Sequence, residues 1–181
     1  MNRALRYGGG LSLGVLSAGV LGFSYVAEIR PNITRSLATP AFVMSEYIAP
    51  KKGRVAAFTP PQGFDPNLPF IKRIAGAPGD LVEVKGDEVF VDGVRIGKAM
   101  TATRGGEPLQ IIPEGVISPN HYFMAGETPS SLDSRYAFVG YIHRDRIQTV
   151  GWELPWGETL FPTFSAARAS TAGAEQDGGG K

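Results

Sequence analysis

The stretch from Asp80 to Ile96, DLVEVKGDEVFVDGVRI, constrains the fold more than any other part of the sequence. Apolar and polar residues alternate along it, and the alternation is interrupted at Gly86-Asp87 and again at Asp92-Gly93. Alternation with a period of two predicts half-buried strands, and Gly-Asp or Asp-Gly between two such runs predicts a tight hairpin turn. The stretch therefore predicts consecutive antiparallel β-hairpins.

Short apolar runs separated by turns make up the rest of the central chain. The chain contains 24 glycines and 14 prolines, a turn-rich composition that suits an all-β fold with short strands. Outside residues 7–27 no part shows a convincing period of 3.6 residues, so no helix is expected there. We therefore predict a mainly β domain, with further strands at Arg54–Phe58, Phe70–Gly76, His121–Gly126, Ala137–His143 and Ile147–Leu154.

Residues 7–27 form an apolar segment without a charged residue. At about 1.5 Å per residue, a helix of this length spans roughly 30 Å, the thickness of the hydrocarbon core of a bilayer. Arg3 and Arg6 precede the segment, and this bias of positive charge predicts a cytoplasmic N-terminus with the rest of the chain outside. We predict residues 1–28 to be a cytoplasmic stub and a single-span transmembrane anchor.

A cleaved signal peptide is the alternative interpretation of this N-terminal segment, because signal peptides also begin with basic residues and continue with an apolar stretch. The apolar stretch is long for a signal peptide. A cut after Ala27 would also place the bulky Tyr25 two positions earlier, where a small residue is usual. An uncleaved anchor is therefore the preferred interpretation.

The C-terminal end differs in kind from the central chain. Residues 165–181, SAARASTAGAEQDGGGK, have no apolar periodicity and are rich in Ala, Gly, Ser and charge. Such a segment buries too little apolar surface to offset its ordering entropy, so we predict a disordered tail. The folded extracytoplasmic domain is predicted at residues 29–164.

Charge and composition exclude several classes of function. The 18 basic and 17 acidic residues give a net charge of +1 and are scattered, so nucleic-acid binding is not expected. The absence of cysteine excludes disulfides, thiol nucleophiles and cysteine-ligated metals. His121 and His143 have no carboxylate beside them at metal-ligand spacing, and we interpret both as strand-end or surface residues. A Ser-His-Asp hydrolase stays possible in principle, but nothing else points to either histidine.

Lys72 is the side chain whose surroundings suggest chemistry. Alternation along FIKRIAG puts it on the same face as Phe70 and Ile74 and turns Arg73 to the opposite face. An exposed lysine on an edge strand is the commoner case for such a pattern, but the two apolar neighbours favour burial. A buried lysine with hydroxyl partners titrates below its ordinary pKa and is then able to act as a general base near neutral pH.

Three ordered segments resemble the type I signal peptidases, the Ser-Lys serine peptidases of family S26. FIKRIAGAPGD, residues 70–80, resembles the general-base segment, and GRVAAFTPP, residues 53–61, resembles the strand before it. HYFMAGETPSSLDSRYAFVGYI, residues 121–142, resembles the downstream box with its core of Ser-x-Asp-Ser-Arg-Tyr. The resemblance implies a signal-peptidase-like antiparallel β domain on one N-terminal transmembrane helix, and it implies no metal or organic cofactor.

The resemblance also assigns the nucleophile. NITRSLATPAF is similar to the Asn-x-Thr-x-Ser segment of the family's conjugative-transfer subgroup, the TraF type, and nominates Ser36. Thr34 then resembles the side-chain donor to the oxyanion, and Lys72 takes the proton of the nucleophile. The usual glycine after the nucleophile is missing and the proline is displaced. Ser45 is the only other serine between the anchor and Lys72, and it stays the alternative nucleophile.

The downstream box supplies residues that support the base. By resemblance, Ser131 hydrogen-bonds and orients the Lys72 amine, and Ser134 belongs to the same supporting group. Asp133 and Arg135 are interpreted as an internal ion pair that holds the Ser131 loop. That pairing is expected to keep Asp133 from supplying a counter-charge that would hold Lys72 protonated.

Three functions are compatible with these residues. The Pro-rich insertion before Lys72, the ending GWELPW, and Glu127 in place of the family's common Gly-Asp-Asn favour the TraF type, whose members process pilin precursors in conjugative type IV secretion. The alternatives are a general signal peptidase that acts on signal-peptide-bearing preproteins, and a non-catalytic anchored component of the transfer apparatus. The resemblance implies the bacterial inner membrane as location, with membrane lipid and possible transfer-apparatus proteins as partners.

Overall fold

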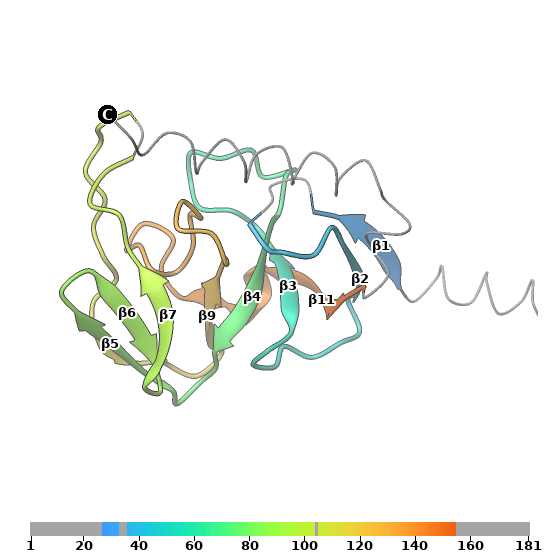
Figure 1. The fold of residues 1–181 in the computed structure, drawn as a ribbon. Helices are drawn as coiled ribbons and strands as arrows, with labels where there is room; N and C mark the ends of the chain where they lie inside the picture. The colour runs from blue at the N-terminus through green and yellow to red at the C-terminus, as the bar shows by residue number, and fades with distance from the viewer. Residues whose placement is uncertain (1–26, 33–35, 104, 155–181) are drawn as a thin grey trace, which may run out of the picture.

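The computed structural model describes residues 27–32, 36–103 and 105–154 of the 181-residue chain (Figure 1). This part consists of strands and one short 3-10 helix, η2 (Arg144–Arg146). The strands are β1 (Glu28–Pro31), β2 (Ala41–Ser45), β3 (Val55–Phe58), β4 (Phe70–Gly76), β5 (Leu81–Lys85), β6 (Glu88–Val91), β7 (Val94–Lys98), β8 (Gly115–Val116), β9 (His121–Ala125), β10 (Ile142–His143) and β11 (Ile147–Glu153).

The larger sheet has seven strands in the order β1-β2-β11-β3-β4-β9-β10, and all of its pairings are antiparallel. β11 lies between β2 and β3, so residues from both ends of the described chain meet in the middle of the sheet. The VAAF run of β3 is buried at all four positions, because apolar clusters cover both faces of this strand. One cluster contains Ala56 and Ile74, and the other contains Ala57 and Ile71.

The smaller sheet has the order β7-β6-β5-β8 and lies at the left of Figure 1. It is built from the two hairpins predicted within Asp80–Ile96. In the second hairpin both turn residues have positive φ, 49° at Asp92 and 72° at Gly93, as a two-residue turn that matches the twist of the flanking strands requires. The mainly β antiparallel architecture is confirmed.

Most predicted strands are confirmed, and one is wrong over most of its length. Of the stretch Ala137–His143 only β10 is a strand, because the chain turns back at Tyr136, whose carbonyl accepts the N–H groups of Val139 and Gly140. Gly140 has a φ of 66°, which is costly for other residues but not for glycine. β1, β2 and β8 were not predicted.

The predicted ends of the chain fall mainly outside the described residues. Of the predicted anchor only residues 27 and 28 are described, and β1 begins at Glu28, one residue before the predicted start of the domain. The predicted tail at 165–181 lies outside the described residues altogether. Within the described part of the chain, no helix has both the length and the apolar character needed to cross a membrane.

Candidate active site

β4 places Lys72 in the interior of the larger sheet. Lys72 pairs in register with Ala56 of β3, so its side chain lies on the face that carries the apolar cluster of Ala56 and Ile74. The residue is 5% exposed, whereas the neighbouring Arg73 is partly exposed. The predicted alternation is therefore confirmed. The Lys72 amine also lies 5.6 Å from the centroid of the Phe70 ring.

A serine hydroxyl is the hydrogen-bond partner of this amine. Lys72 Nζ donates to Ser131 Oγ at 2.8 Å, across 59 residues of sequence. Burial lowers the pKa of Lys72 from its ordinary 10.5 to about 8. The Asp133 carboxylate acts in the opposite direction and raises this pKa, while the Arg135 guanidinium lowers it. Pairing with Arg135 therefore only partly prevents the Asp133 carboxylate from stabilising the Lys72 ammonium.

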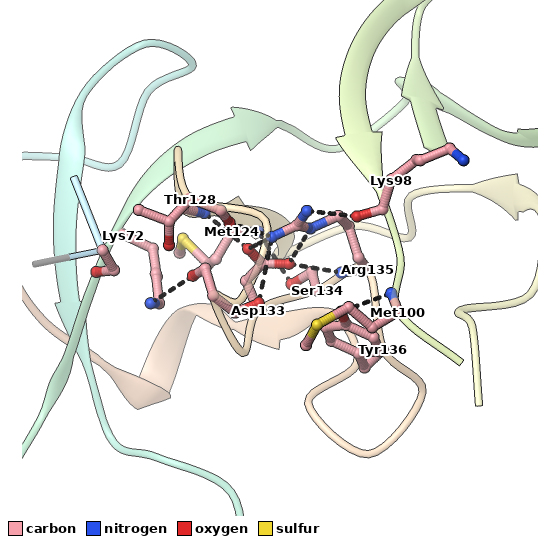
Figure 2. A network of polar contacts seen from close by, with 12 residues as sticks. Lys72, Lys98, Met100, Met124, Thr128, Asp133, Ser134, Arg135 and Tyr136 are labelled. Atoms are coloured by element: carbon pink, nitrogen blue, oxygen red, sulfur yellow. Dashed lines mark hydrogen bonds and ion pairs between the residues drawn. The ribbon is translucent and has the colours of Figure 1, made fainter. Parts of the chain in front are cut away.

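Asp133 and Arg135 form a buried ion pair, 0% and 2% exposed, at the centre of the network in Figure 2. Arg135 Nε donates to Asp133 Oδ1 at 2.9 Å and Nη2 donates to Oδ2 at 2.8 Å, a bidentate arrangement. The remaining guanidinium N–H groups are directed to the carbonyl oxygens of Lys98, Thr128 and Ser131. The pair thus holds the Ser131 loop to the end of β7.

Ser134 continues the attachment of this loop to β9. Its N–H donates to the Met124 carbonyl at 2.8 Å, and its hydroxyl accepts the Met124 N–H at 3.0 Å. The same hydroxyl donates to the Gly140 carbonyl at 2.7 Å. Ser134 therefore anchors the loop that carries Ser131 and does not itself touch Lys72 in the contacts described here.

Ser36 lies next to the strand that carries Lys72. It is 4% exposed, and its hydroxyl donates to the carbonyl oxygen of Ile71 at 3.0 Å. Ile71 precedes Lys72, so the sheet brings the predicted nucleophile beside the backbone of the predicted base. The side chain of Asn32 supports this segment, because its amide donates to the carbonyls of Leu37 and Thr39 at 2.7 and 2.9 Å.

The alternative nucleophile lies further away along the sheet. Ser45 of β2 is in register with Val150 of β11, which pairs with Ala56 of β3, which pairs with Lys72. Three strand spacings separate the two backbones, which is roughly 14 Å. This distance argues for Ser36 over Ser45. Thr34, the predicted oxyanion donor, lies outside the described residues.

Two further residues of the site have roles that the sequence did not reveal. A Cβ on Gly126 would lie 2.1 Å from Ser131 Oγ and 3.0 Å from the Ser36 carbonyl oxygen, so only glycine fits between these two serines. Glu127 donates its N–H to the same Ser36 carbonyl at 2.7 Å. The sequence signal was the position of both residues directly after β9, in the segment that departs from the family's usual pattern.

The two histidines lie together on the edge of the larger sheet. His121 of β9 pairs with His143 of β10, and their rings meet edge to face with centroids 4.9 Å apart. His121 Nδ1 lies 2.9 Å from the Pro119 carbonyl, and His143 Nδ1 accepts the Asp145 N–H at 3.3 Å. In the described residues, no group of three or more His, Asp or Glu side chains is arranged to hold a metal ion.

Comparison with known proteins identifies the family. The sequence model described as signal peptidase, peptidase S26 matches residues 14–153, more than half of the chain. The chain belongs to this family. The matched range contains Ser36, Lys72 and Ser131.

The chain is only distantly similar in sequence to two individual signal peptidases. The chain is 30% identical to the signal peptidase I of Pseudomonas fluorescens in a match that covers 48% of this chain and 39% of that protein. It therefore spans well under half the length of this curated relative. The chain is also similar to the crystal structure of a signal peptidase I from Enterococcus faecalis, with 22% identity and a TM-score of 0.38, over 57% of this chain and 97% of that one.

Proposed function

We propose that this protein is a signal-peptidase-type serine endopeptidase in which Ser36 is the nucleophile and Lys72 the general base. The observation that carries the proposal is the environment of Lys72: a buried amine, bonded to Ser131 and with a pKa lowered to about 8. With this pKa about one Lys72 side chain in ten is neutral at pH 7, and the fraction grows as bound substrate excludes more water.

The proposed reaction has two halves. Ser36 Oγ attacks the scissile carbonyl carbon while its proton passes to neutral Lys72 Nζ, and a C–O bond forms. The C–N bond then breaks, and the Lys72 ammonium returns the proton to the leaving amine. In the second half Lys72 takes a proton from a water molecule, whose oxygen forms a new bond to the ester carbonyl carbon. The bond from that carbon to Ser36 Oγ then breaks, and the Lys72 ammonium returns the proton to Oγ. Ser131 accepts a hydrogen bond from Nζ throughout and keeps the amine directed at the nucleophile.

The test is cleavage of a purified signal-peptide-bearing preprotein by the full-length protein in detergent. Ser36→Ala and Lys72→Met are each expected to abolish cleavage, because one lacks the attacking oxygen and the other the base. Ser45→Ala serves as the matched serine control and is expected to keep wild-type cleavage. Cleavage retained by either of the first two variants, with the fold intact by circular dichroism, would refute the dyad.

The pH dependence gives a second test of the base. The rate of the wild type is expected to rise about tenfold per pH unit below pH 7 and to level off above about pH 8, where Lys72 is neutral. Single-turnover rates between pH 6 and 10 measure this limb directly. A rate that is constant across that range would contradict a lysine base.

The preferred substrate is a preprotein with a signal peptide, and a pilin precursor of a conjugative secretion system is the second candidate. The second candidate is favoured by the Pro-rich insertion at residues 61–69, the ending GWELPW and Glu127 in place of the family's common Gly-Asp-Asn. A side-by-side assay of a secretory preprotein and a pilin precursor separates the two. Faster cleavage of the preprotein supports a general signal peptidase, and cleavage of the pilin precursor alone supports the TraF-type role.

The proposal includes a location. Residues 7–27 have the length and composition of a single transmembrane span, which would hold the Ser36 segment close to the outer surface of a bacterial inner membrane. Membrane fractionation and protease accessibility in intact spheroplasts test this placement. Recovery of the full-length chain in the soluble fraction would contradict it.

A further inference from the structure

The side chain of Glu127 joins the nucleophile segment to the strand of the base. Its Oε2 accepts the Ala38 N–H at 2.6 Å, two residues after Ser36, and its Oε1 accepts from Arg73 Nη2 at 2.7 Å. Its own N–H donates to the Ser36 carbonyl at 2.7 Å. One residue therefore holds the Ser36 segment through two hydrogen bonds and fixes it to the residue that follows Lys72.

The ion pair with Arg73 does not by itself explain this arrangement. Arg73 Nη2 also contacts Glu153 Oε1 of β11, so the guanidinium has a second carboxylate partner from the larger sheet. Glu127 differs from Glu153 in the contacts described here because its second oxygen reaches the backbone of the nucleophile segment. A carboxylate that accepts a backbone N–H makes a charge-assisted hydrogen bond, which is stronger than a neutral one.

The backbone that carries Glu127 is also held in place through the preceding residue. The preceding Gly126 donates its N–H to Asp133 Oδ2 at 2.8 Å, and Gly126 packs directly against Ser131. The backbone at 126–127 thus touches both the support of the base and the nucleophile segment. A shift of the Ser36 hydroxyl by about 1 Å relative to Lys72 would cost on the order of 100-fold in rate.

We propose that Glu127 is a positioning residue that sets the place of Ser36 relative to Lys72 through its hydrogen bond to the Ala38 N–H. This inference rests on the proposed function, since it takes Ser36 as the nucleophile. Glu127 touches neither the Ser36 hydroxyl nor Lys72 in the contacts described here, so its effect passes through the segment that it holds.

The experiment compares Glu127→Ala, Glu127→Gln and the matched control Glu153→Gln in the full-length protein. Glu127→Ala is expected to lower kcat for preprotein cleavage by about 10- to 100-fold with little change in KM. Glu127→Gln is expected to recover most of that loss, because the amide oxygen still accepts the Ala38 N–H. Glu153→Gln removes a carboxylate from Arg73 but not from Ala38 and is expected to keep wild-type kcat.

Two readouts separate positioning from a loss of structure. The pH at which the rate levels off is expected to stay the same in Glu127→Ala, because burial and the Asp133–Arg135 pair set the pKa of Lys72. A loosened fold would hydrate Lys72 and move that pH upward. Amide hydrogen exchange at Ala38 is expected to accelerate in Glu127→Ala and to stay at the wild-type rate in both Gln variants.

Each contrary outcome overturns the inference. Equal losses in Glu127→Gln and Glu127→Ala would show that the charge, and not the bond to Ala38, is what matters. An equal loss in Glu153→Gln would assign the effect to Arg73, and unchanged exchange at Ala38 would show that Glu127 does not hold the segment. If the wild type cleaves neither a secretory preprotein nor a pilin precursor, the proposed function fails, and the exchange data still decide whether Glu127 holds the segment.

Discussion

The two sheets of the molecule differ in whether the charged side chains compared here are buried or exposed. The larger sheet and the loop packed on it bury Lys72, Asp133 and Arg135 at 5%, 0% and 2% exposure. The smaller sheet keeps its charges in solvent, as in the pairs Arg95–Glu88 and Lys98–Asp87. Among the described residues, the only polar bond between the smaller sheet and the buried network uses a backbone acceptor of the sheet: the Arg135 side chain donates through Nη1 to the Lys98 carbonyl.

This difference shows where electrostatics acts in the protein. A charge in water is screened and its partners contribute little, whereas a buried charge is costly unless it is paired. In the larger sheet this cost of burying a charge has two consequences. Burial lowers the pKa of Lys72, and it makes the loop that carries Ser131 depend on the Asp133–Arg135 pair. Removing a charged side chain should therefore have a much larger effect on stability and activity in the buried network than in the smaller sheet.

The largest effect is expected when the buried pair is broken. Arg135→Met leaves Asp133 buried without its partner, and such a change typically costs about 3–5 kcal/mol of unfolding free energy. Arg135 lowers the pKa of Lys72 while Asp133 raises it, so the pH at which the cleavage rate levels off should also move upward. Urea unfolding and a pH–rate profile measure the two effects. A loss of stability below about 1 kcal/mol would mean that the pair behaves like a surface pair.

An opposite effect on stability is expected at Lys72. The folded state releases the Lys72 proton near pH 8 and the unfolded state near 10.5, so between these values the unfolded chain binds more protons and stability rises with pH. Below about pH 8 the full cost of the buried ammonium is present. At pH 7 Lys72→Met should therefore raise the unfolding free energy by about 2–3 kcal/mol, after the lost bond to Ser131 is counted.

Denaturant unfolding of wild type and Lys72→Met at pH 7 and pH 10 tests this sign. The stability difference is expected to shrink at pH 10, where the folded wild type already holds a neutral lysine. The variant is expected to be inactive at both values, so stability and activity separate at one residue. A variant less stable than the wild type at pH 7 would show that burial of the Lys72 ammonium carries no cost.

The same contrast explains how much of the structure could be predicted from the sequence. The hairpins of the smaller sheet depend on turns two residues long and on alternation, which are local, and β4 and the burial of Lys72 followed from alternation as well. β1 and β2 depend on pairing with each other and, for β2, with the distant β11. β8 is two residues long and carries too little pattern to be found.

In the candidate site, too, features encoded by local sequence were predicted, and some contacts between distant residues were not. The roles of Lys72, Ser36 and Ser131 are predictions from motifs. The structure shows Lys72 Nζ bonded to Ser131 Oγ and the Ser36 hydroxyl bonded to the Ile71 carbonyl, and the catalytic roles stay predictions. The contacts of Glu127 with Ala38 and Arg73 bridge 89 and 54 residues of sequence, and no local pattern encodes them. The close approach of Gly126 to Ser131 is likewise a property of the packed loop and not of the HYFMAG segment itself.

A smaller effect is expected where the site is packed without charge. Gly126→Ala forces a Cβ against Ser131 and the Ser36 carbonyl, and overpacking of this kind typically costs about 1–3 kcal/mol. Activity should fall as well, because Ser131 must move away from Lys72. Gly105→Ala is the matched control, since its added Cβ meets Thr103 Oγ1 at an ordinary 3.6 Å. Equal unfolding free energies and equal kcat for the two variants would contradict the close packing at Gly126.

The smallest effect is expected from the charges of the smaller sheet. Arg95→Gln and Lys98→Gln remove exposed ion pairs with Glu88 and Asp87, which water and salt already screen. The Lys98 backbone carbonyl still accepts from Arg135 after the side chain is changed, so the buried network is expected to keep its geometry. Unfolding midpoints and cleavage rates of both variants should match the wild type at low and at high salt. A salt-dependent loss of cleavage in Lys98→Gln would show that the smaller sheet acts on the site through its charge and not through its backbone alone.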